Sequence, residues 1–380
     1  MRTGRSRDLG EGVRTAPRRS GDTWPVHGWA ATLASPSARQ SSALRVAAMF
    51  DLVDVPMKVL VELKDRLVRM PGLRNAYDKA LNAREFADYY EHDRMLADRV
   101  RMTAYQRAIT EHVMPGQTVL DLGTGNGVLA LLCAAQGAEV HAVDHSPIIA
   151  AAQSVAEANG LARRIHFHRM HSQRLVLPQK VDVIIHEQLG DALFNERLVE
   201  NLMDARARLL KPKGRILPAR FQLFVEPVCL RPEFRTPFLW TQKVGPVDFS
   251  SLRSRYTSLP PSYFRKLIRQ NEVEALLCKP APVLSVDLDT LDAEQLPTSL
   301  SYRREVRLGG MLDGFVVYFR AAFDEHNAFD TGPGSPRTHW GMMLLRVEPQ
   351  TVRAGDLLTL QLSVPRLEDV NGWRWRVAAT

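Results

Sequence analysis

The pattern of apolar and polar residues divides the chain into four segments. Residues 1–48 have no apolar periodicity and are rich in Arg, Ser, Gly and Pro, which predicts a disordered extension. Apolar residues at helical spacing predict an N-terminal helical segment over 49–85. Over 86–218 a helical stretch precedes alternating strand-like and helical runs, which are typical of a doubly wound, Rossmann-like parallel sheet. Short alternating runs over 219–380 predict an all-β, barrel-like domain.

Composition limits the class of protein. A chain of 380 residues that is 45% hydrophobic can bury a large core, and the length favours two domains. No apolar run is long enough for a membrane span or a signal-peptide core. Three widely spaced cysteines, Cys133, Cys229 and Cys278, are typical of buried thiols in a reducing compartment, so we expect a cytoplasmic protein. Since no His, Cys or acidic cluster has ligand spacing, no metal site is predicted.

The net charge of +8 is concentrated at the N-terminus. Residues 1–48 hold eight arginines, no lysine and three acidic residues, so this segment accounts for +5 of the total. The remaining segments are nearly balanced in charge, which argues against nucleic-acid binding by a basic face as the function. The Arg- and Ser-rich segment is either a targeting peptide or an extension before Met49 without a role in the folded protein.

A glycine-rich loop follows the first strand of the alternating region. In "VLDLGTGNG" (119–127), Gly123, Gly125 and Gly127 let the backbone approach a ligand closely and offer N–H groups at a helix N-terminus. The spacing D-x-G-x-G-x-G, led by Asp121, resembles the S-adenosylmethionine loop of class I methyltransferases more than a dinucleotide fingerprint. Asp144 ends the next strand, where a carboxylate can accept hydrogen bonds from ribose hydroxyls.

Two carboxylates follow a later strand. In "HEQLGDALFNERL" (186–198), Glu187 and Glu196 stand nine positions apart directly after an apolar run. Loop glutamates are most often solvated surface acids, but the carboxyl end of a strand is where ligands bind in such sheets. The pair therefore favours an active-site role.

Several motifs together resemble those of the protein arginine methyltransferases. Besides the double-glutamate loop, these are "HDRMLADRVRMTAY" (92–105), "GRILPARFQLFVEPV" (214–228) and "SPRTHW" (335–340), in the order of that family. The resemblance covers roughly residues 86–380 and implies an arginine N-methyltransferase that uses S-adenosyl-L-methionine. It also implies roles for single residues: Glu187 and Glu196 as catalytic, substrate-binding groups; Asp98 and His339 as a catalytic pair linking the first helix to the Thr-His-Trp loop; His92, Met95, Arg101 and Ser172 as cofactor contacts; Asp191 and Trp340 as substrate contacts.

Departures from the family pattern leave the substrate open. Gln188, Asp191 and Asn195 replace aromatic residues around the loop, and His186 replaces a small one, so we expect a more polar substrate tunnel. Asp191 could pair with a free α-amino group. The alternatives are therefore a protein or peptide substrate, a small guanidine such as free arginine, or a non-catalytic scaffold that retains the fold. The intact glutamates and glycine loop favour an enzyme.

The stretch 230–264 interrupts the alternating pattern of the β domain. It is rich in proline, and its position resembles the dimerisation arm of the family. It also carries a cluster of large apolar residues that need cover, namely Phe234, Phe238, Leu239, Trp240 and Phe249. We expect a partner subunit to provide that cover, which predicts a homodimer.

Overall fold

A computed structural model describes residues 89–379, apart from the side chains of 256–258 and 261. The segments predicted over 1–48 and 49–85, and the first three residues of the region predicted over 86–218, lie outside the described residues. Within the described part no helix is long and apolar enough to cross a membrane.

The first half of the described chain alternates helices and strands as predicted. The helices are α4 (Tyr89–Ala97), α5 (Arg99–His112), α6 (Val128–Ala135), α7 (Ile149–Ala158) and α8 (Leu198–Leu209). The strands are β1 (Thr118–Leu122), β2 (Glu139–Asp144), β3 (Ile165–Arg169), β4 (Val181–His186) and β5 (Leu210–Leu217). Two short 3₁₀ turns, η1 (Ala162–Arg164) and η2 (Ser172–Arg174), flank β3.

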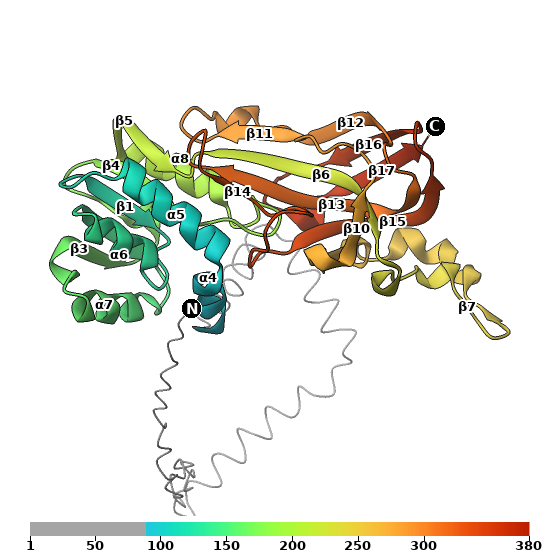
Figure 1. Cartoon of the computed structure of the whole chain (residues 1–380), viewed down its shortest axis with the longest axis horizontal. Helices are drawn as coiled ribbons and strands as arrows, with labels where there is room; N and C mark the ends of the chain where they lie inside the picture. The colour runs from blue at the N-terminus through green and yellow to red at the C-terminus, as the bar shows by residue number, and fades with distance from the viewer. Residues whose placement is uncertain (1–88, 380) are drawn as a thin grey trace, which may run out of the picture. The chain divides into compact units, whose positions relative to one another are not determined.

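These strands form one parallel sheet with the order β3-β2-β1-β4-β5 (Figure 1). The chain moves outward from β1 to β3 and then returns to β4 on the other side of β1, so the direction of winding reverses between β1 and β4. The carboxyl ends of β1 and β4 therefore lie next to each other at the reversal, where ligands bind in doubly wound sheets. The glycine loop follows β1, and the double-glutamate loop follows β4.

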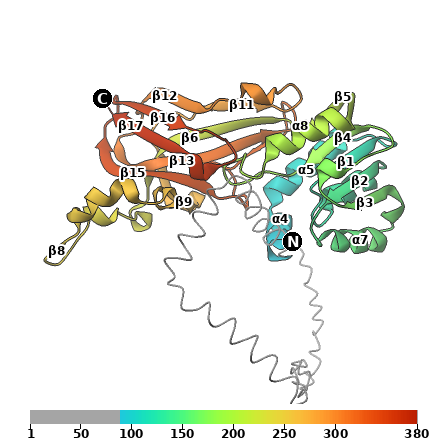
Figure 2. The same ribbon diagram turned by 180° about the vertical axis from the view of Figure 1, so that it is seen from behind.

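The second half of the described chain is built almost entirely of antiparallel strands, as predicted (Figures 1 and 2). The main sheet has the order β10-β6-β13-β15-β9, with β11 on β6 and β14 on β13, and a smaller sheet has the order β12-β16-β17. The strands are β6 (Arg220–Leu230), β9 (Arg265–Ile268), β10 (Val273–Leu276), β11 (Leu284–Asp287), β12 (Ser299–Glu305), β13 (Gly310–Ala322), β14 (Ala328–Asp330), β15 (Met342–Val352), β16 (Leu357–Ser363) and β17 (Arg374–Ala379). Three 3₁₀ turns, η7 (Gln270–Glu272), η8 (Ala293–Gln295) and η9 (Val370–Gly372), connect them.

The central strands of the main sheet bury both of their faces. Side chains alternate between the faces of a strand, so β6 sends Leu223 and Val225 into the large core and Phe224 and Val228 into a second, smaller cluster. Strand β13 does the same. This double burial explains why the sequence of β6 is a nearly continuous apolar run. The large core is continuous through both halves of the described chain.

The helical stretch predicted at the start of the region 86–218 is divided into α4 and α5 at Asp98. The carboxylate of Asp98 caps α5 by accepting a hydrogen bond from the main-chain N–H of Arg101 at 3.0 Å. Asp is a favoured N-cap residue because its side chain satisfies an N–H that has no partner within the helix. The cap turns α4 away from α5 and brings its residues over the glycine loop.

The arm predicted over 230–264 folds into 3₁₀ turns and one hairpin outside the main sheet. The turns are η3 (Pro232–Phe234), η4 (Leu239–Thr241), η5 (Ser250–Ser258) and η6 (Pro261–Phe264), and the hairpin pairs β7 (Lys243–Val244) with β8 (Val247–Asp248). In Figures 1 and 2 the hairpin extends away from the sheet.

The expectation that a partner covers the arm's aromatic residues is wrong for two of them. Phe238 and Trp240 are only 2% and 4% exposed within this chain. They stack on each other with ring centroids 4.7 Å apart, Arg346 lies over the Phe238 ring, and Trp240 donates to Glu348 at 2.8 Å. Phe234 and Phe249 are half-buried, whereas Leu239 is exposed. Side chains of β15, about a hundred residues later in the sequence, therefore help to bury Phe238 and Trp240.

Candidate functional site

The glycine loop between β1 and α6 adopts a backbone that requires glycine. Gly123, Gly125 and Gly127 have φ values of +78°, +53° and +83°, which side chains of L residues rarely permit. A Cβ atom at Gly125 would lie 2.9 Å from Cε1 of His92, and one at Gly127 would lie 2.6 Å from Cβ of Ala152. The glycines therefore allow α4 and α7 to approach the loop closely.

The two acidic residues predicted around this loop have different positions. Asp121 is buried beneath the loop, where its Oδ2 accepts from Thr124 Oγ1 at 2.6 Å and from the Ala130 N–H at 3.0 Å. Burial raises the pKa of Asp121 to about 7. It does not line the cavity described below, so the prediction that it contacts a ligand is corrected to a structural role: it holds the loop to α6.

Asp144 lies at the end of β2, on the opposite side of the same loop. Its Oδ2 accepts from the Gly125 N–H at 2.9 Å, and its Oδ1 accepts from the Ser146 N–H at 2.7 Å. Each carboxylate oxygen has further lone pairs, so Asp144 can accept additional hydrogen bonds. It lines the cavity, as expected for a residue that binds ligand hydroxyls.

A cavity of about 210 Å³ opens at the carboxyl ends of β1, β2 and β4. It brings together most of the residues predicted for the site: His92, Met95, Arg101, Gly123, Gly125, Asp144, Ser172, Glu187 and Glu196. Predicted residues that do not line it are Asp98, Asp121, Gly127, Asp191, His339 and Trp340. One continuous space thus holds both the glycine-loop contacts and the two glutamates.

The two glutamates occupy the start and the end of the loop between β4 and α8. His186, the last residue of β4, is fully buried, and its Nε2 lies 2.9 Å from the Pro218 carbonyl oxygen; burial lowers its pKa to about 4, so it is neutral. The Tyr105 hydroxyl donates to the His186 carbonyl at 2.7 Å. Glu187 follows this anchored position directly, so the backbone that leads into it is held by the core.

Arg101 of α5 forms an ion pair with Glu187 inside the cavity. Its Nη2 donates to Glu187 Oε2 at 3.0 Å, and the two side chains are only 5% and 10% exposed. Its Nη1 donates to the Met95 carbonyl at 3.1 Å, whereas its buried Nε has no hydrogen-bond partner. The pair joins a residue predicted to bind cofactor to one predicted to bind substrate.

The predicted pair of Asp98 and His339 is confirmed. Asp98 Oδ2 lies 2.9 Å from Nδ1 of His339 and accepts from the main-chain N–H of His339 at 2.8 Å. Burial opposes ionisation of this carboxyl, but its hydrogen bonds from the His339 side chain and from the N–H groups of Arg101 and His339 outweigh burial and lower its pKa. An ionised Asp98 keeps the imidazole proton on Nδ1.

Asp191 and Trp340 connect the loops behind the cavity instead of lining it. Asp191 Oδ1 accepts from the Gly341 N–H at 2.7 Å. Trp340 is 6% exposed, donates through Nε1 to the Leu189 carbonyl, and stacks on Phe329 with centroids 5.3 Å apart. These contacts replace the substrate roles predicted for both residues with a structural one: they attach the Thr-His-Trp loop to the double-glutamate loop.

The expected polarity of the tunnel is only partly present. Of the three polar replacements, Gln188 lines the cavity. Asn195 instead turns into the loop, where its Oδ1 accepts from the Ala192 N–H at 3.0 Å, and Asp191 is bound to Gly341. The replacements therefore stabilise the loop more than they change the cavity wall.

Other lining residues were missed by the sequence analysis. Among them are Thr124, Asn126, His145, Met170, His171, Gln173, Arg197 and Asn201. His145 and His171 stack with ring centroids 4.6 Å apart. Both follow strands of the parallel sheet within two residues of a strand end, which is the position that predicts ligand contacts in such folds.

Comparison with known proteins gives two family matches that divide the chain as the fold does. A methyltransferase domain matches residues 119–214, and an arginine methyltransferase oligomerization subdomain matches residues 220–371.

Curated proteins and solved structures agree with these matches. Protein arginine N-methyltransferase 6 of Xenopus tropicalis is 31% identical over 294 residues, which cover 72% of this chain and 84% of that protein. Protein arginine N-methyltransferase 2 of the same species is 31% identical over 284 residues, and here the chain spans only 64% of the relative's length. The structure of the Trypanosoma brucei PRMT1 enzyme-prozyme heterotetrameric complex with AdoHcy is similar with a TM-score of 0.64 and 26% identity, covering 73% of this chain and 88% of that one.

Proposed function

Because the chain belongs to the protein arginine N-methyltransferase family, we propose that it transfers a methyl group from S-adenosyl-L-methionine to an arginine guanidinium in a protein or peptide. The observation that carries this proposal is the single cavity lined by the glycine loop, Asp144, Arg101 and the two glutamates.

The residues at the glycine-loop end of the cavity fit the cofactor. The buried Nε of Arg101 has no partner, and a carboxylate of the methionine moiety would satisfy it. Asp144 would accept hydrogen bonds from ribose hydroxyls, and the loop glycines admit the cofactor close to the backbone. When bound, S-adenosylmethionine supplies an electrophilic methyl group on a sulfonium.

The residues at the other end fit a guanidinium. Glu187 and Glu196 both line this end of the cavity, where Glu187 pairs with Arg101. A guanidinium stays protonated and presents its donors in one plane, so it could donate hydrogen bonds to both carboxylates. Two carboxylates accepting from a planar group would orient one of its nitrogens for in-line transfer and lower the entropic part of the barrier.

The Asp98 and His339 pair supports a route for the proton that leaves the methylated nitrogen. Because the ionised Asp98 accepts from Nδ1 of His339, the imidazole keeps its basic lone pair on Nε2. We propose that a glutamate oxygen takes the proton first and that His339 Nε2 receives it afterwards.

A protein or peptide arginine is favoured over free arginine. The observation that pointed to a small guanidine was Asp191, which could have paired with a free α-amino group. Its Oδ1 already accepts from the Gly341 N–H, and it does not line the cavity. The intact pair of glutamates argues against a non-catalytic scaffold.

The deciding experiment supplies S-adenosylmethionine with either an arginine-rich peptide or free arginine and detects methylated products by mass spectrometry. We expect peptide methylation that falls at least a hundredfold in Glu187→Gln and Glu196→Gln. Glu157→Gln, an exposed position on α7, is the matched control and should keep wild-type turnover. Methylation of neither substrate, or unchanged turnover in both active-site variants, would contradict the proposal.

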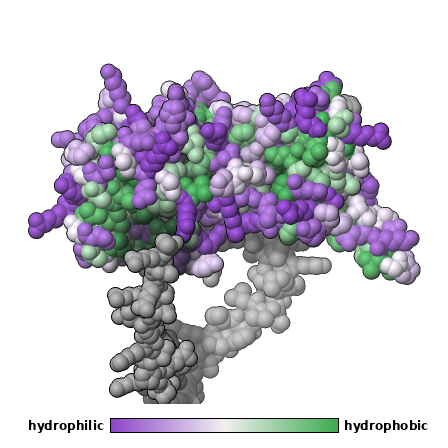
Figure 3. Space-filling model, viewed as in Figure 1, coloured by the Kyte–Doolittle hydropathy of each residue, from purple (hydrophilic) through white to green (hydrophobic). Residues whose placement is uncertain are grey.

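We also propose that the chain forms a homodimer through the β7–β8 hairpin. Val244 and Val247 at its tip are 63% and 53% exposed, and the tip forms an apolar spot in Figure 3. The match of 220–371 to an oligomerization subdomain supports this. Light scattering should give a dimeric mass for the wild type and a monomeric mass for Val244→Asp with Val247→Asp; a monomeric wild type would end the proposal.

Two further assignments are proposals of the same kind. We place the domain boundary after Pro218, supported by the change of family match between 214 and 220. We propose a cytoplasmic location, supported by three free cysteines that are all buried. Limited proteolysis tests the boundary, and imaging of a fluorescently tagged full chain tests the location.

A further inference from the structure

Three histidines share one face of the parallel sheet at its edge. His141 on β2 is the register partner of His166 on β3, and His168 follows two residues later on the same strand. Since alternate residues of a strand point to the same side, all three imidazoles project from one face. His166 is exposed, and the other two are half-buried.

The cluster is accessible because of the connection between β3 and β4. In the described chain that connection contains a single 3₁₀ turn, η2, where a doubly wound fold usually has an α-helix. The opposite face of β2 and β3 is covered by α6 and α7. The burial pattern agrees, since Val140 and Ala142 on either side of His141 are fully buried.

The nitrogen atoms are already near the spacing that a metal ion requires. Nδ1 of His141 and Nε2 of His168 lie 3.1 Å apart. Two imidazole nitrogens on a tetrahedral zinc ion, each at about 2.0–2.1 Å, are separated by about 3.4 Å. For a metal ion to replace the shared proton, the two nitrogens would separate by about 0.3 Å and the rings would turn until both lone pairs point at the ion, while the displaced proton moves to the other nitrogen of the same ring.

His166 can complete a set of three ligands. Its ring stacks on that of His141 with centroids 5.1 Å apart, and its exposed side chain can rotate towards the same point. Neutral imidazoles are the form that binds zinc, copper and nickel.

We propose that His141, His166 and His168 bind one divalent transition-metal ion of the zinc, nickel or copper class, with water completing the coordination. The ion cross-links β2 to the edge strand β3. This site lies outside the cavity proposed for catalysis and is independent of the proposed methyl transfer. The sequence analysis predicted no metal site because the ligands come from two strands that are separated by α7.

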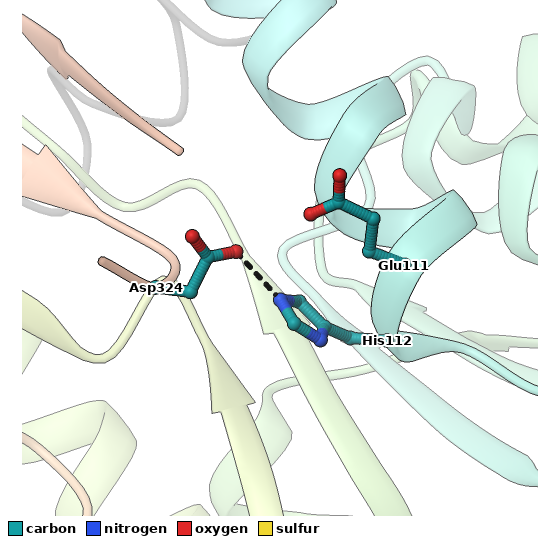
Figure 4. Close-up of side chains that lie close together, drawn as sticks. All are labelled: Glu111, His112 and Asp324. Atoms are coloured by element: carbon teal, nitrogen blue, oxygen red, sulfur yellow. Dashed lines mark hydrogen bonds and ion pairs between the residues drawn. The ribbon is translucent and has the colours of Figure 1, made fainter. Parts of the chain in front are cut away.

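A second group of possible ligands consists of Glu111, His112 and Asp324 (Figure 4). Arg215 donates to Nδ1 of His112 at 2.9 Å, which fixes the proton on Nε2, and Nε2 lies 2.8 Å from Asp324. Both ring nitrogens are therefore committed. Arg107 also pairs with Glu111, so the group is a neutralised brace between α5 and the turn after β13.

The test is a zinc titration of the untagged full chain in competition with a chromophoric chelator. We expect one zinc ion with a micromolar or tighter Kd, weakened at least tenfold in His141→Gln and in His168→Gln and several-fold in His166→Gln. His326→Gln, an exposed histidine outside the cluster, is the matched control and should bind as the wild type does.

Unfolding temperatures measured with and without zinc separate loss of a ligand from loss of the fold. Without metal, all variants should unfold within a few degrees of the wild type, and zinc should raise the unfolding temperatures of the wild type and of His326→Gln by more than those of the three cluster variants. Zinc affinity that is unchanged in His141→Gln and His168→Gln, or lost equally in His326→Gln, would overturn the proposal. So would an affinity weaker than micromolar in the wild type.

Discussion

Asp98 offers the sharpest test of how the site is assembled, because one carboxylate makes three hydrogen bonds between two distant segments. It caps α5 through the Arg101 N–H, accepts from the His339 N–H and pairs with the His339 imidazole. In Asp98→Ala, loss of the cap costs about 1 kcal/mol. The His339 N–H left without an acceptor costs about 1–3 kcal/mol, and the charge-assisted bond about 1.5–3 kcal/mol. These three costs do not add fully, because all three hydrogen bonds involve the same carboxylate. We therefore expect the free energy of unfolding to fall by about 3 kcal/mol.

The measurement is equilibrium unfolding in urea near neutral pH, followed by circular dichroism. Asp93→Ala, an exposed acid on α4, is the control and should change stability by less than about 0.5 kcal/mol. Folding lowers the pKa of Asp98 below the value of 3.8 that it has in the unfolded chain. The stability that Asp98 contributes to the wild type should therefore be present above pH 3.8 and be lost as the pH falls below that value. If the free energy of unfolding falls by less than about 1 kcal/mol in Asp98→Ala, the three hydrogen bonds of Asp98 do not stabilise the fold as described.

Asp98→Asn separates stability from proton handling. The amide oxygen can still cap α5, so the loss of stability should be smaller than in the alanine variant. Its N–H₂ group, however, would donate to Nδ1 of His339 and move the imidazole proton to Nε2. We therefore expect the rate of methyl transfer to fall at least as far as in Asp98→Ala. A wild-type rate in Asp98→Asn would remove His339 from the proton route.

The other predictions concern single groups of the site. Asp144→Ala should weaken binding of S-adenosylhomocysteine at least tenfold in calorimetry, since ligand hydrogen bonds and support for Gly125 are both removed; unchanged affinity would contradict its role. Arg101→Lys should weaken cofactor binding about tenfold, because a lysine cannot donate from two faces to Glu187 and a ligand carboxylate; equal affinity would exclude that contact. Burial raises the pKa of Asp121 to about 7, so the wild type should lose stability relative to Asp121→Asn as the pH rises from about 4 to about 7; parallel stability curves would show that Asp121 is not buried as described.

The features that residue patterns alone predicted correctly are local ones, whereas the long-range pair of Asp98 and His339 came from the family resemblance. Strand and helix positions follow from hydrophobic period, and the glycine loop follows from conformational limits within five residues. The Asp98 cap was within reach of the same reasoning, because an acid before "RVRMTAY" is a common helix start. The region is nevertheless predicted as one helical stretch, because its apolar spacing continues through the cap.

The features that it missed depend on residues far apart in the chain. Phe238 and Trp240 looked uncovered because their neighbours, Arg346 and Glu348, lie on a strand more than a hundred residues later. The histidine cluster depends on the register between β2 and β3, which neither strand specifies alone. Composition and spacing contain no information about such pairings.

The position of the double-glutamate loop is determined jointly by both halves of the described chain. Four contacts converge on the Thr-His-Trp loop of the β domain: Asp98 with His339, Arg94 with the His339 carbonyl at 3.0 Å, Trp340 with the Leu189 carbonyl, and Gly341 with Asp191. Two of these hold α4 and the start of α5, which carry the His92, Met95 and Arg101 wall of the cavity. The other two hold the loop between Glu187 and Glu196. Carboxylates must be positioned within a few tenths of an ångström to orient a guanidinium. The β domain therefore contributes to the chemistry without lining the cavity, by fixing the helices and the loop that do.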